Sequence, residues 1–327
     1  MKVLLTGGAG YIGSVLSNIL INNKIKVYIV DNLSTGFQLN INKKANFYKK
    51  DIRDEEFLKK LLKKEKIKNV IHLAAGMSND DSIKNPSKYY INNIYGTYKL
   101  LNACENSKVS NLIFSSSCAV YGKNLTRKIS ENHPKNPVAP YGLTKLLGEH
   151  LIIERAKKKF NYAILRYFNV VGADLKNKNG QINKNDQLFQ NIALAVLGKK
   201  KLFIYGNKFE TKDGFAVRDF IDVNDLAYLH FKFLDKLNKN KNNYIVNCGY
   251  GNGNTVKEII DHFQSISKHK LIYKIKPRRK GDIPFSICDN TKLNHTINWK
   301  PDFEDVRKSI KNTILWNEYL VKKNYNL

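Results

Sequence analysis

Tyr141 and Lys145 are the two residues whose types and spacing most directly suggest chemistry. They lie four residues apart in Tyr141-Gly-Leu-Thr-Lys145, inside a stretch whose pattern predicts a helix over 141–158. Residues i and i+4 share one face of a helix, so the phenol and the ammonium can point into the same cleft. A nearby cation favours the phenolate, and it should move the pKa of the tyrosine from about 10 toward neutrality. The pair would then act as a general acid and base on an alcohol or sugar hydroxyl.

Three consecutive serines supply further hydroxyl groups. Ser115, Ser116 and Ser117 directly follow the apolar run Leu112–Phe114, which predicts a strand. Hydroxyls at the carboxyl end of a central parallel strand face the ligand crevice of an α/β fold. Ser117 is therefore a candidate to bind the reacting hydroxyl. An ordinary surface helix pair and a polar strand end remain the alternative interpretations of these two patterns.

A glycine-rich turn opens the chain and predicts a dinucleotide site. An apolar strand over 3–5 and a helix over 11–21 flank three glycines spaced G-x-x-G-x-x-G, at positions Gly7, Gly10 and Gly13. Such a turn lets backbone N–H groups and the helix N-terminus face a pyrophosphate. Asp31 closes the second strand about 20 residues on, where a carboxylate binds the ribose hydroxyls. Because that carboxylate would repel a 2′-phosphate, we expect NAD rather than NADP. A plain strand–helix turn and an exposed loop aspartate are the alternatives.

The elements that must position these residues alternate between strands and helices. Short apolar runs predict strands at 3–5, 27–30, 47–48, 70–73, 112–114 and 162–165, with helical stretches between them. This rhythm predicts an α/β fold with a Rossmann-type, doubly wound parallel sheet. After Asn169 the rhythm changes to shorter elements. We therefore expect an NAD-binding domain over 1–168, with later contributions from about 215–248, and a smaller α/β substrate domain over 169–327.

Composition narrows the class of protein. No run of the 327 residues approaches the ~18 apolar residues of a membrane helix, and the N-terminus carries no export signal, so we expect a cytoplasmic protein without a membrane partner. The four cysteines are far apart in sequence and predict neither a disulfide framework nor a metal site. The net charge of +28 comes from lysines spread along the chain rather than gathered in one tail. We therefore expect no nucleic-acid partner.

Taken together, these motifs resemble the extended short-chain dehydrogenase/reductases, and among them the UDP-glucose 4-epimerases. The resemblance runs through nearly the whole chain. Its first half comprises TGGAGYIGS at 6–14, DNLS at 31–34, DIRD at 51–54, VIHLAA at 70–75 and YYINNIYGT at 89–97. Its second half comprises FSSSCAVYG at 114–122, PYGLTK at 140–145, LRYFNVVGA at 165–173, DGFAVRDFIDVNDLA at 213–227 and PRRKGDIP at 277–284.

The resemblance implies a role for each matching residue. Tyr141 would be the catalytic acid and base, Lys145 would bind the nicotinamide ribose, and Ser117 would bind O4 of the sugar. The NAD site would further include Gly7, Gly10, Tyr11, Ile12, Gly13, Asp31, Asn32, Asp51, Ile52 and Asn93. The UDP-sugar site would include Asn169 near the sugar nucleotide, Arg218 and Arg279 on the diphosphate, Asp282 on the uridine ribose, and Ser286. Two arginines suit a diphosphate because each offers a planar fork of donors.

The implied reaction is inversion at C4 of a UDP-hexose. A hydride would pass from C4 of the sugar to NAD, which leaves a 4-keto sugar. The keto sugar would rotate, and the hydride would return to its other face.

The chain departs from the family at two positions. Gln187 stands where the family usually has an asparagine at the start of the substrate helix, and Ser286 stands where it frequently has a tyrosine. A small residue enlarges the pocket beside the C2 substituent, so we expect UDP-N-acetylhexosamines to be accepted as well as UDP-glucose and UDP-galactose.

Several alternatives stay open. A 4-keto-sugar reductase, a decarboxylase or an epimerase of UDP-uronic acids would share the fold and the Tyr–Lys pair. A 4,6-dehydratase needs an acidic pair where Cys118 and Ala119 stand, which argues against it. A non-catalytic, basic protein that binds NAD or RNA is the alternative from another class. Relatives commonly pair through two long helices, here about 87–106 and 141–158, so the resemblance also implies a homodimer.

Overall fold

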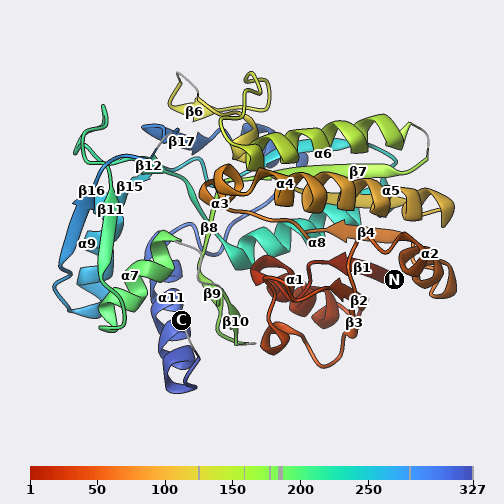
Figure 1. The fold of residues 1–327 in the computed structure, drawn as a ribbon, viewed down its shortest axis with the longest axis horizontal. Coiled ribbons are helices and arrows are strands. Elements are labelled where there is room, and N and C mark those ends of the chain that lie inside the picture. Colours follow the sequence, from red (N-terminus) through yellow and green to blue (C-terminus); the bar gives the residue numbers. More distant parts are fainter. Residues whose placement is uncertain (124–125, 158, 177, 183–186, 280, 326–327) are drawn as a thin grey trace. The chain divides into compact units, whose positions relative to one another are not determined.

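The computed structural model describes residues 1–123, 126–157, 159–176, 178–182, 187–279 and 281–325 (Figure 1). Contacts between Cα atoms divide the chain into two compact units. The first unit comprises 1–122, 132–167 and 227–246, and the second comprises 123–131, 168–226 and 247–327. The chain thus passes between the units several times, and residues far apart in sequence build each of them.

The first unit is built on a parallel sheet of seven strands. Its strand order is β14-β7-β5-β4-β1-β2-β3. From β1 the chain adds β2 and β3 on one side and then β4, β5, β7 and β14 on the other, as in a doubly wound fold. The predicted fold class is confirmed. The strands are β1 (Lys2–Thr6), β2 (Lys26–Asp31), β3 (Asn46–Lys49), β4 (Asn69–His72), β5 (Asn111–Ser117), β7 (Asn161–Tyr167) and β14 (Tyr244–Cys248).

Helices connect these strands and bury both faces of the sheet. One core lies under α2 (Glu55–Lys64), α5 (Gly96–Asn106) and α6 (Pro140–Ala156), and it takes in Leu4 and Phe114 from the strands. Successive strand side chains point to opposite faces, so the neighbours of these residues, such as Val3 and Leu5, meet α1 (Tyr11–Asn22) and its surroundings. The helix α8 (Val223–Lys239) begins in the second unit and runs into the first. Figure 1 shows α5 and α6 side by side.

The predicted helix over 87–106 is interrupted in an informative place. Its first turn is α4 (Pro86–Tyr89), a π-helical segment η2 (Tyr90–Tyr95) follows, and α5 completes it. A short helix α3 (Asn79–Lys84), which the sequence pattern did not indicate, precedes this stretch. Single π-helical turns inside α-helices occur frequently at functional sites. Here the segment contains Asn93, one of the predicted cofactor residues.

The second unit is smaller, and its small sheets contain both parallel and antiparallel strand pairs. A four-stranded sheet has the order β15-β12-β17-β6, from Asn254–Thr255, Val217–Arg218, Phe285–Cys288 and Lys128–Ile129. Three two-stranded pairs join β8 (Asn169–Val171) to β13 (Phe220–Asp222), β9 (Ala173–Asp174) to β10 (Asn179–Gly180), and β11 (Leu202–Tyr205) to β16 (Tyr273–Lys276). The helices are α7 (Leu188–Val196), α9 (Val256–Ser267), α10 (Thr291–Thr296) and α11 (Val306–Lys322).

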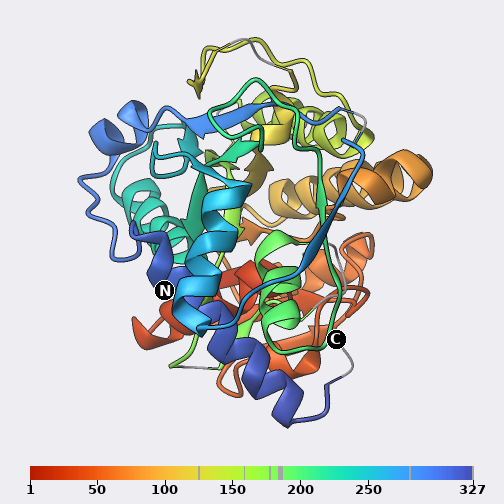
Figure 2. The same cartoon turned by 90° about the vertical axis from the view of Figure 1, so that its left-hand side faces the viewer.

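Three of these helices enclose the core of the second unit. α11 packs against both α7 and α9, and Ile192, Ile260 and Ile310 lie fully buried between them (Figure 2). α9 begins with a capping box in which Thr255 and Glu258 satisfy each other's backbone N–H groups. Residues 183–186 and 326–327 lie outside the described residues.

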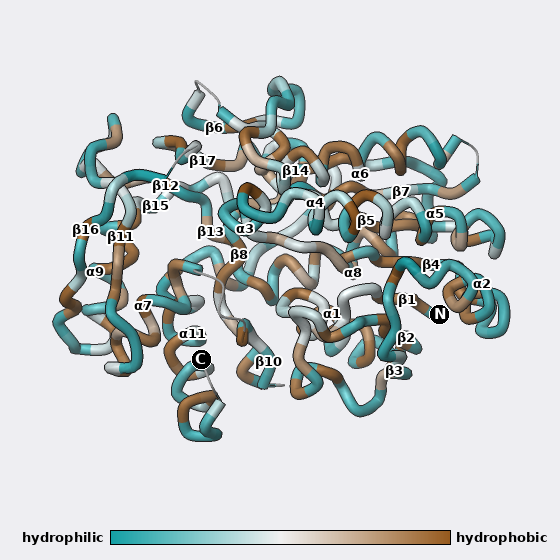
Figure 3. Tube along the Cα trace, viewed as in Figure 1, coloured by the Kyte–Doolittle hydropathy of each residue, from teal (hydrophilic) through white to brown (hydrophobic). Residues whose placement is uncertain are grey.

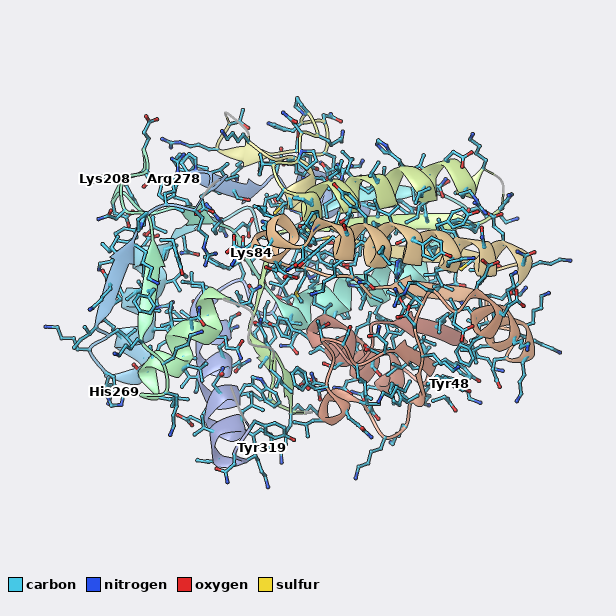
Figure 4. All side chains as sticks on the ribbon, in the orientation of Figure 1. Tyr48, Lys84, Lys208, His269, Arg278 and Tyr319 are labelled. Carbon is cyan, nitrogen blue, oxygen red and sulfur yellow. The ribbon has the colours of Figure 1, made fainter. Side chains whose placement is uncertain are left out.

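Hydrophilic residues are spread over both units rather than gathered on one element (Figure 3). Exposed basic side chains include Lys84 of α3 and, in two loops of the second unit, Lys208 and Arg278 (Figure 4). Among the described residues, no helix is long and apolar enough to span a bilayer. In the same part of the chain, no group of three or more His, Cys, Asp or Glu residues could hold a metal ion.

Candidate active site

The glycine turn between β1 and α1 has the geometry of a dinucleotide cradle. Gly7 has a φ of +74°, which disfavours any residue with a Cβ. A Cβ there would stand 2.6 Å from the backbone nitrogen of Ala74, and one at Gly13 would stand 2.3 Å from the carbonyl oxygen of Gly7. Gly10 is the N-cap of α1. Only glycines allow so close a packing of strand, turn and helix, and the helix N-terminus is left to face an anion.

Asp31 ends β2 beside this turn and is buried. Its carboxylate accepts the backbone N–H of Ala9 at 3.0 Å and that of Leu33 at 2.8 Å. Burial raises its pKa, and these two hydrogen bonds oppose the rise. A carboxylate can accept about four hydrogen bonds, so two acceptor positions remain for ribose hydroxyls. The residues present therefore fit an NAD molecule, which agrees with the expectation from the sequence.

Asp51 forms an ion pair with Arg53, a residue that the sequence analysis did not consider. Arg53 holds its carboxylate with two side-chain bonds, from Nε at 2.8 Å and from Nη2 at 2.7 Å, and Asn32 donates to it at 2.9 Å. The guanidinium keeps the pKa of Asp51 well below its usual range. Ile52 is buried, in the core under α2, α5 and α6. Two of the predicted cofactor residues, Asn32 and Asp51, are thus joined in one polar group with Arg53.

Ser117, Tyr141 and Lys145 come together from β5 and α6. The Tyr141 side chain is hydrogen-bonded to that of Ser117, whose oxygen also accepts the backbone N–H of Ala119 at 3.2 Å. The Lys145 ammonium is buried and donates to the carbonyl oxygen of Ser115 at 2.6 Å. Pro140 occupies the first turn of α6, where its fixed φ suits the start of a helix. The structure thus brings Ser117 and Tyr141 together, and Lys145, one helical turn after Tyr141, bonds the backbone of the strand that carries Ser117. These three residues are called the Ser117–Tyr141–Lys145 constellation below.

The electrostatics of this constellation differ from the expectation. Burial raises the pKa of Tyr141 to about 12, and only the hydrogen bond from Ser117 acts in the opposite direction among the protein groups. Burial also lowers the pKa of Lys145 to about 7, while the charge of Glu149 acts to raise it. The expected shift of Tyr141 toward neutrality is wrong for the protein alone, because desolvation of the phenolate outweighs the hydrogen bond from Ser117.

A buried ion pair, which the sequence analysis missed, holds α6 against the sheet. Arg166 of β7 donates to Glu149 of α6 from Nε at 2.9 Å and from Nη2 at 2.6 Å. Ser116 also donates to Glu149, and Tyr121 accepts from Arg166 at 2.8 Å. Burial alone would lower the pKa of Arg166, but the Glu149 carboxylate outweighs it and holds the pKa above its ordinary value. The pair fixes the helix that carries Tyr141 and Lys145.

A second buried network lies at the end of β4. The Nδ1 of His72 is 2.8 Å from the Thr6 hydroxyl, and its Nε2 is 2.9 Å from the Thr97 hydroxyl. Thr97 donates its own proton to the carbonyl oxygen of Asn93, so Nε2 of His72 must be the donor and Nδ1 the acceptor. Burial, and then the charge of Lys145, lower the pKa of His72 to about 3. The neutral imidazole therefore connects β1 and β4 to Thr97 of α5, and through Thr97 to Asn93 of the π-helical segment.

Asn93 itself acts as a link between segments. Its side chain accepts the backbone N–H of Gly76 at 2.8 Å and donates to the carbonyl oxygen of Gly76 at 3.1 Å. It also donates to the Thr144 hydroxyl at 2.9 Å. Thr144 lies between Tyr141 and Lys145, so Asn93 connects the loop after β4 to the catalytic helix. Its side chain is buried, and its contacts are with the protein.

The predicted UDP-sugar residues belong to the second unit. Arg218 and Ser286 are register partners in the parallel pair of β12 and β17, so both side chains project from the same face of that sheet. Arg279 stacks its guanidinium 4.0 Å from the centre of the Tyr205 ring, and the backbone N–H of Asp282 donates to the carbonyl oxygen of Arg279. The two arginines and Ser286 thus come from the β12–β17 sheet and the segment that leads into it.

Asn169 and Gln187 also lie in the second unit. Asn169 is the first residue of β8 and is exposed. Gln187 is the N-cap residue of α7, so it does stand where that helix begins, although its side chain makes no capping hydrogen bond. Glutamine is a poorer N-cap than asparagine because its longer side chain fits the cap geometry less well.

Comparison with known proteins identifies the class. Residues 3–249 match the NAD dependent epimerase/dehydratase family, and the chain belongs to this family. It is 37% identical over 321 residues to a UDP-glucose 4-epimerase of Lactobacillus helveticus, with 97% of each chain covered. The resemblance inferred from the sequence is confirmed: the chain groups with the UDP-glucose 4-epimerases.

Solved structures give the same result. A UDP-glucose 4-epimerase from Bifidobacterium longum, in complex with NAD⁺ and UDP, is 32% identical and superposes with a TM-score of 0.91, covering 100% of this chain and 99% of that one. A UDP-Glc/GlcNAc 4-epimerase from Campylobacter jejuni is 35% identical with a TM-score of 0.85, covering 97% and 99%. Both the fold and the order of its elements are therefore those of this enzyme class.

Proposed function

We propose that this chain inverts C4 of a UDP-hexose through a transient 4-keto sugar, with Tyr141 as the acid and base of the reaction. Its class, an NAD-dependent nucleotide-sugar 4-epimerase, follows from its family and its near-full-length relatives. The observation that carries the assignment of residues is the Ser117–Tyr141–Lys145 constellation, in which Ser117 ends β5 of the same parallel sheet whose β1 leads into the glycine turn. General acid–base catalysis requires such a group within hydrogen-bond reach of the proton it moves.

The cofactor and the protein divide the chemistry. NAD, when bound, would supply the hydride acceptor and a positive charge. Ser117 holds the O4 hydroxyl, Tyr141 takes its proton and later returns it, and Lys145 binds the nicotinamide ribose. Gly7, Gly10 and Gly13 open the pyrophosphate site, and Asp31 accepts the adenosine ribose hydroxyls. The high pKa of Tyr141 in the protein alone means that the phenol stays protonated until further positive charge lowers it.

The second unit binds the UDP-sugar. Arg218 and Arg279 bind the diphosphate, Asp282 binds the uridine ribose, and Asn169 approaches the sugar nucleotide. Register pairing of Arg218 with Ser286 supports this assignment, because a guanidinium and a small hydroxyl then share one sheet face. Arginine suits the diphosphate because its planar fork matches two phosphate oxygens at once.

The experiment that tests the function uses three substrates. Purified protein is incubated separately with UDP-glucose, UDP-N-acetylglucosamine and UDP-glucuronic acid, and inversion at C4 is followed by NMR. We expect inversion without added NAD(H) and without its net consumption. Turnover that requires stoichiometric external NAD(H) would instead identify a reductase or decarboxylase, and inversion of the uronic acid alone would contradict the UDP-hexose assignment.

Ser286 sets the sugar that is accepted. Its side chain is small and buried, and it lies beside Arg218 in the sheet. Replacing Ser286 with tyrosine should fill the space proposed for the C2 substituent. We expect kcat/KM for UDP-N-acetylglucosamine to fall by roughly 10-fold or more, with a much smaller loss on UDP-glucose, since a pocket change of this size is worth about 1–3 kcal/mol. The Campylobacter jejuni relative, a UDP-Glc/GlcNAc 4-epimerase, supports dual specificity.

Ser286→Ala is the matched control for this test. It keeps the residue small and removes only the hydroxyl, so it should retain the wild-type ratio of activities on the two sugars. Equal losses on both sugars in the tyrosine variant would contradict a role for this residue in choosing the sugar.

We also propose that the enzyme is a homodimer that pairs through η2, α5 and α6. Ile91, Tyr95, Tyr98 and Ile153 on these elements are between 37% and 49% exposed, which is unusual for large apolar side chains gathered on adjacent helices. Sedimentation of the wild type should show a dimer, and Ile91→Asp should shift it to a monomer. Ile272→Asp is the control, because Ile272 is 86% exposed on the second unit and should leave the dimer intact.

A cytoplasmic location agrees with the thiol chemistry. None of the four cysteines forms a disulfide, and three of them are buried. Reduced thiols are the usual state in the cytoplasm, whereas exported proteins generally pair them.

A further inference from the structure

Asp219 is a fully buried aspartate between β12 and β13, with an exposed fraction of 0%. Its carboxylate accepts three backbone N–H groups from two other segments. Tyr250 donates at 3.0 Å, Gly251 at 2.8 Å and Cys288 at 3.1 Å. Burial raises the pKa of Asp219 to about 6, and these three hydrogen bonds act to lower it. The carboxylate is therefore the point at which the loop after β14 and the end of β17 are joined to β12.

The backbone of Asp219 extends this connection to the proposed UDP-sugar residues. Its N–H donates to the carbonyl oxygen of Ser286 at 2.9 Å, and its own carbonyl oxygen accepts the N–H of Asn169 at 3.0 Å. Arg218 is the residue directly before it. Three residues proposed to contact the sugar nucleotide are thus either bonded or adjacent to this one aspartate.

We infer that Asp219 is a positioning residue for the UDP-sugar: its buried carboxylate fixes the relative positions of Arg218, Ser286 and Asn169. This inference rests on the proposed function. Gly249 supports it, because a Cβ there would stand 2.7 Å from a carboxylate oxygen of Asp219, so the loop approaches the carboxylate as closely as a glycine permits. Hydrogen bonds to a buried charged acceptor are among the stronger ones in proteins. Weakening these hydrogen bonds should let β12, which carries Arg218, and β17, which carries Ser286, shift independently.

Asp222 offers a matched control in the same unit. It is also fully buried, and burial raises its pKa to about 7. Its carboxylate accepts from the N–H and side chain of Asn224 and from the Ser309 hydroxyl. These partners belong to α8 and α11, and neither is a proposed substrate residue. An amide at Asp222 therefore tests the cost of altering a buried aspartate without altering the proposed positioning.

The experiment compares Asp219→Asn with Asp222→Asn in the enzyme as purified. Asparagine keeps one oxygen acceptor but turns an NH₂ group toward backbone N–H donors. We expect Asp219→Asn to weaken UDP binding in calorimetry, and to raise KM for the UDP-hexose, by roughly 10-fold or more. Its NAD content should equal that of the wild type, and kcat should fall less than KM rises. Asp222→Asn should lower the unfolding temperature while leaving UDP affinity within about twofold, since its carboxylate bonds Asn224 and Ser309 rather than any proposed substrate residue.

A second variant keeps the test decisive. Gly249→Ala places a methyl group 2.7 Å from a carboxylate oxygen of Asp219 and 2.6 Å from Cβ of Cys288, one of the three residues whose N–H this carboxylate accepts. It should weaken UDP binding in the same direction, so it replaces Asp219→Asn if that variant fails to fold. UDP affinity unchanged in either folded variant, or lost equally in Asp222→Asn, would overturn the positioning role. Wild-type protein that binds neither UDP nor a UDP-hexose would instead refute the proposed function, so the two failures are distinguishable.

Discussion

Replacing Tyr141 with phenylalanine should lower kcat by ~10²–10⁴-fold while UDP affinity stays close to that of the wild type. The substitution removes the phenol oxygen that moves the C4 hydroxyl proton, and it keeps the ring that packs edge-on to Tyr89 at 6.5 Å between ring centres. The measurement is steady-state turnover of a UDP-hexose together with UDP binding by calorimetry. A loss confined to KM would mean that Tyr141 only binds the substrate.

The matched control is Tyr28→Phe. Tyr28 is also buried in the first unit, and burial raises its pKa, but its hydroxyl bonds Glu65 rather than a serine of β5. This variant should turn over at close to the wild-type rate. Unchanged turnover in Tyr141→Phe, or an equal loss in the control, would remove Tyr141 from its proposed role.

Replacing Ser117 with alanine should change how the rate of the reaction depends on pH. The Ser117 hydrogen bond lowers the pKa of Tyr141 against the opposing effect of burial. Its removal should therefore raise that pKa and move the rising limb of the pH–rate profile to higher pH. The phenol must lose its proton before it can act as a base, so kcat at neutral pH should fall. A profile that loses height at every pH without moving would argue that Ser117 holds the sugar and has no effect on the phenol.

The parts of the site that were predicted from the sequence are those encoded by local spacing. Gly7, Gly10 and Gly13 must be neighbours of one turn, and Tyr141 and Lys145 must share one helix face, whatever the rest of the fold does. The family, the Rossmann-type fold and the NAD-dependent epimerase class are confirmed by the comparisons and by the sheet order. The assignment of individual residues to NAD and UDP-sugar contacts remains a prediction that the variants above test.

The parts that were missed depend on tertiary contact. Glu149 and Arg166 are 17 residues apart on a helix and a strand, and nothing in their spacing indicates that they meet. His72 likewise bonds Thr97, 25 residues away. The direction of the Tyr141 pKa was misjudged for a related reason, because a motif shows the nearby lysine but not the desolvation of both groups. Arg53 is different: it lies two residues after Asp51, and its bidentate contact was open to inference from the sequence.

Replacing Arg166 with methionine should produce the largest loss of stability among these variants. The side chains of Arg166 and Glu149 are only 3% and 1% exposed. Removing one partner leaves the other as an uncompensated buried charge, which typically costs about 3–5 kcal/mol. We expect the free energy of unfolding, measured by urea denaturation, to fall by about this amount. Because α6 carries Tyr141 and Lys145, turnover should fall with it even below the unfolding temperature.

Two further variants separate the buried charge from the packing. Arg155 of α6 also pairs with a glutamate, Glu105, but these side chains are 23% and 15% exposed, so Arg155→Met should cost far less, within about 1 kcal/mol. The double variant Glu149→Leu/Arg166→Met removes both charges and should recover most of the stability lost in Arg166→Met, since a well-packed apolar pair can replace a buried ion pair. A double variant as unstable as the single one would show that the hydrogen bonds to Ser116 and Tyr121, and not the unpaired charge, account for the loss.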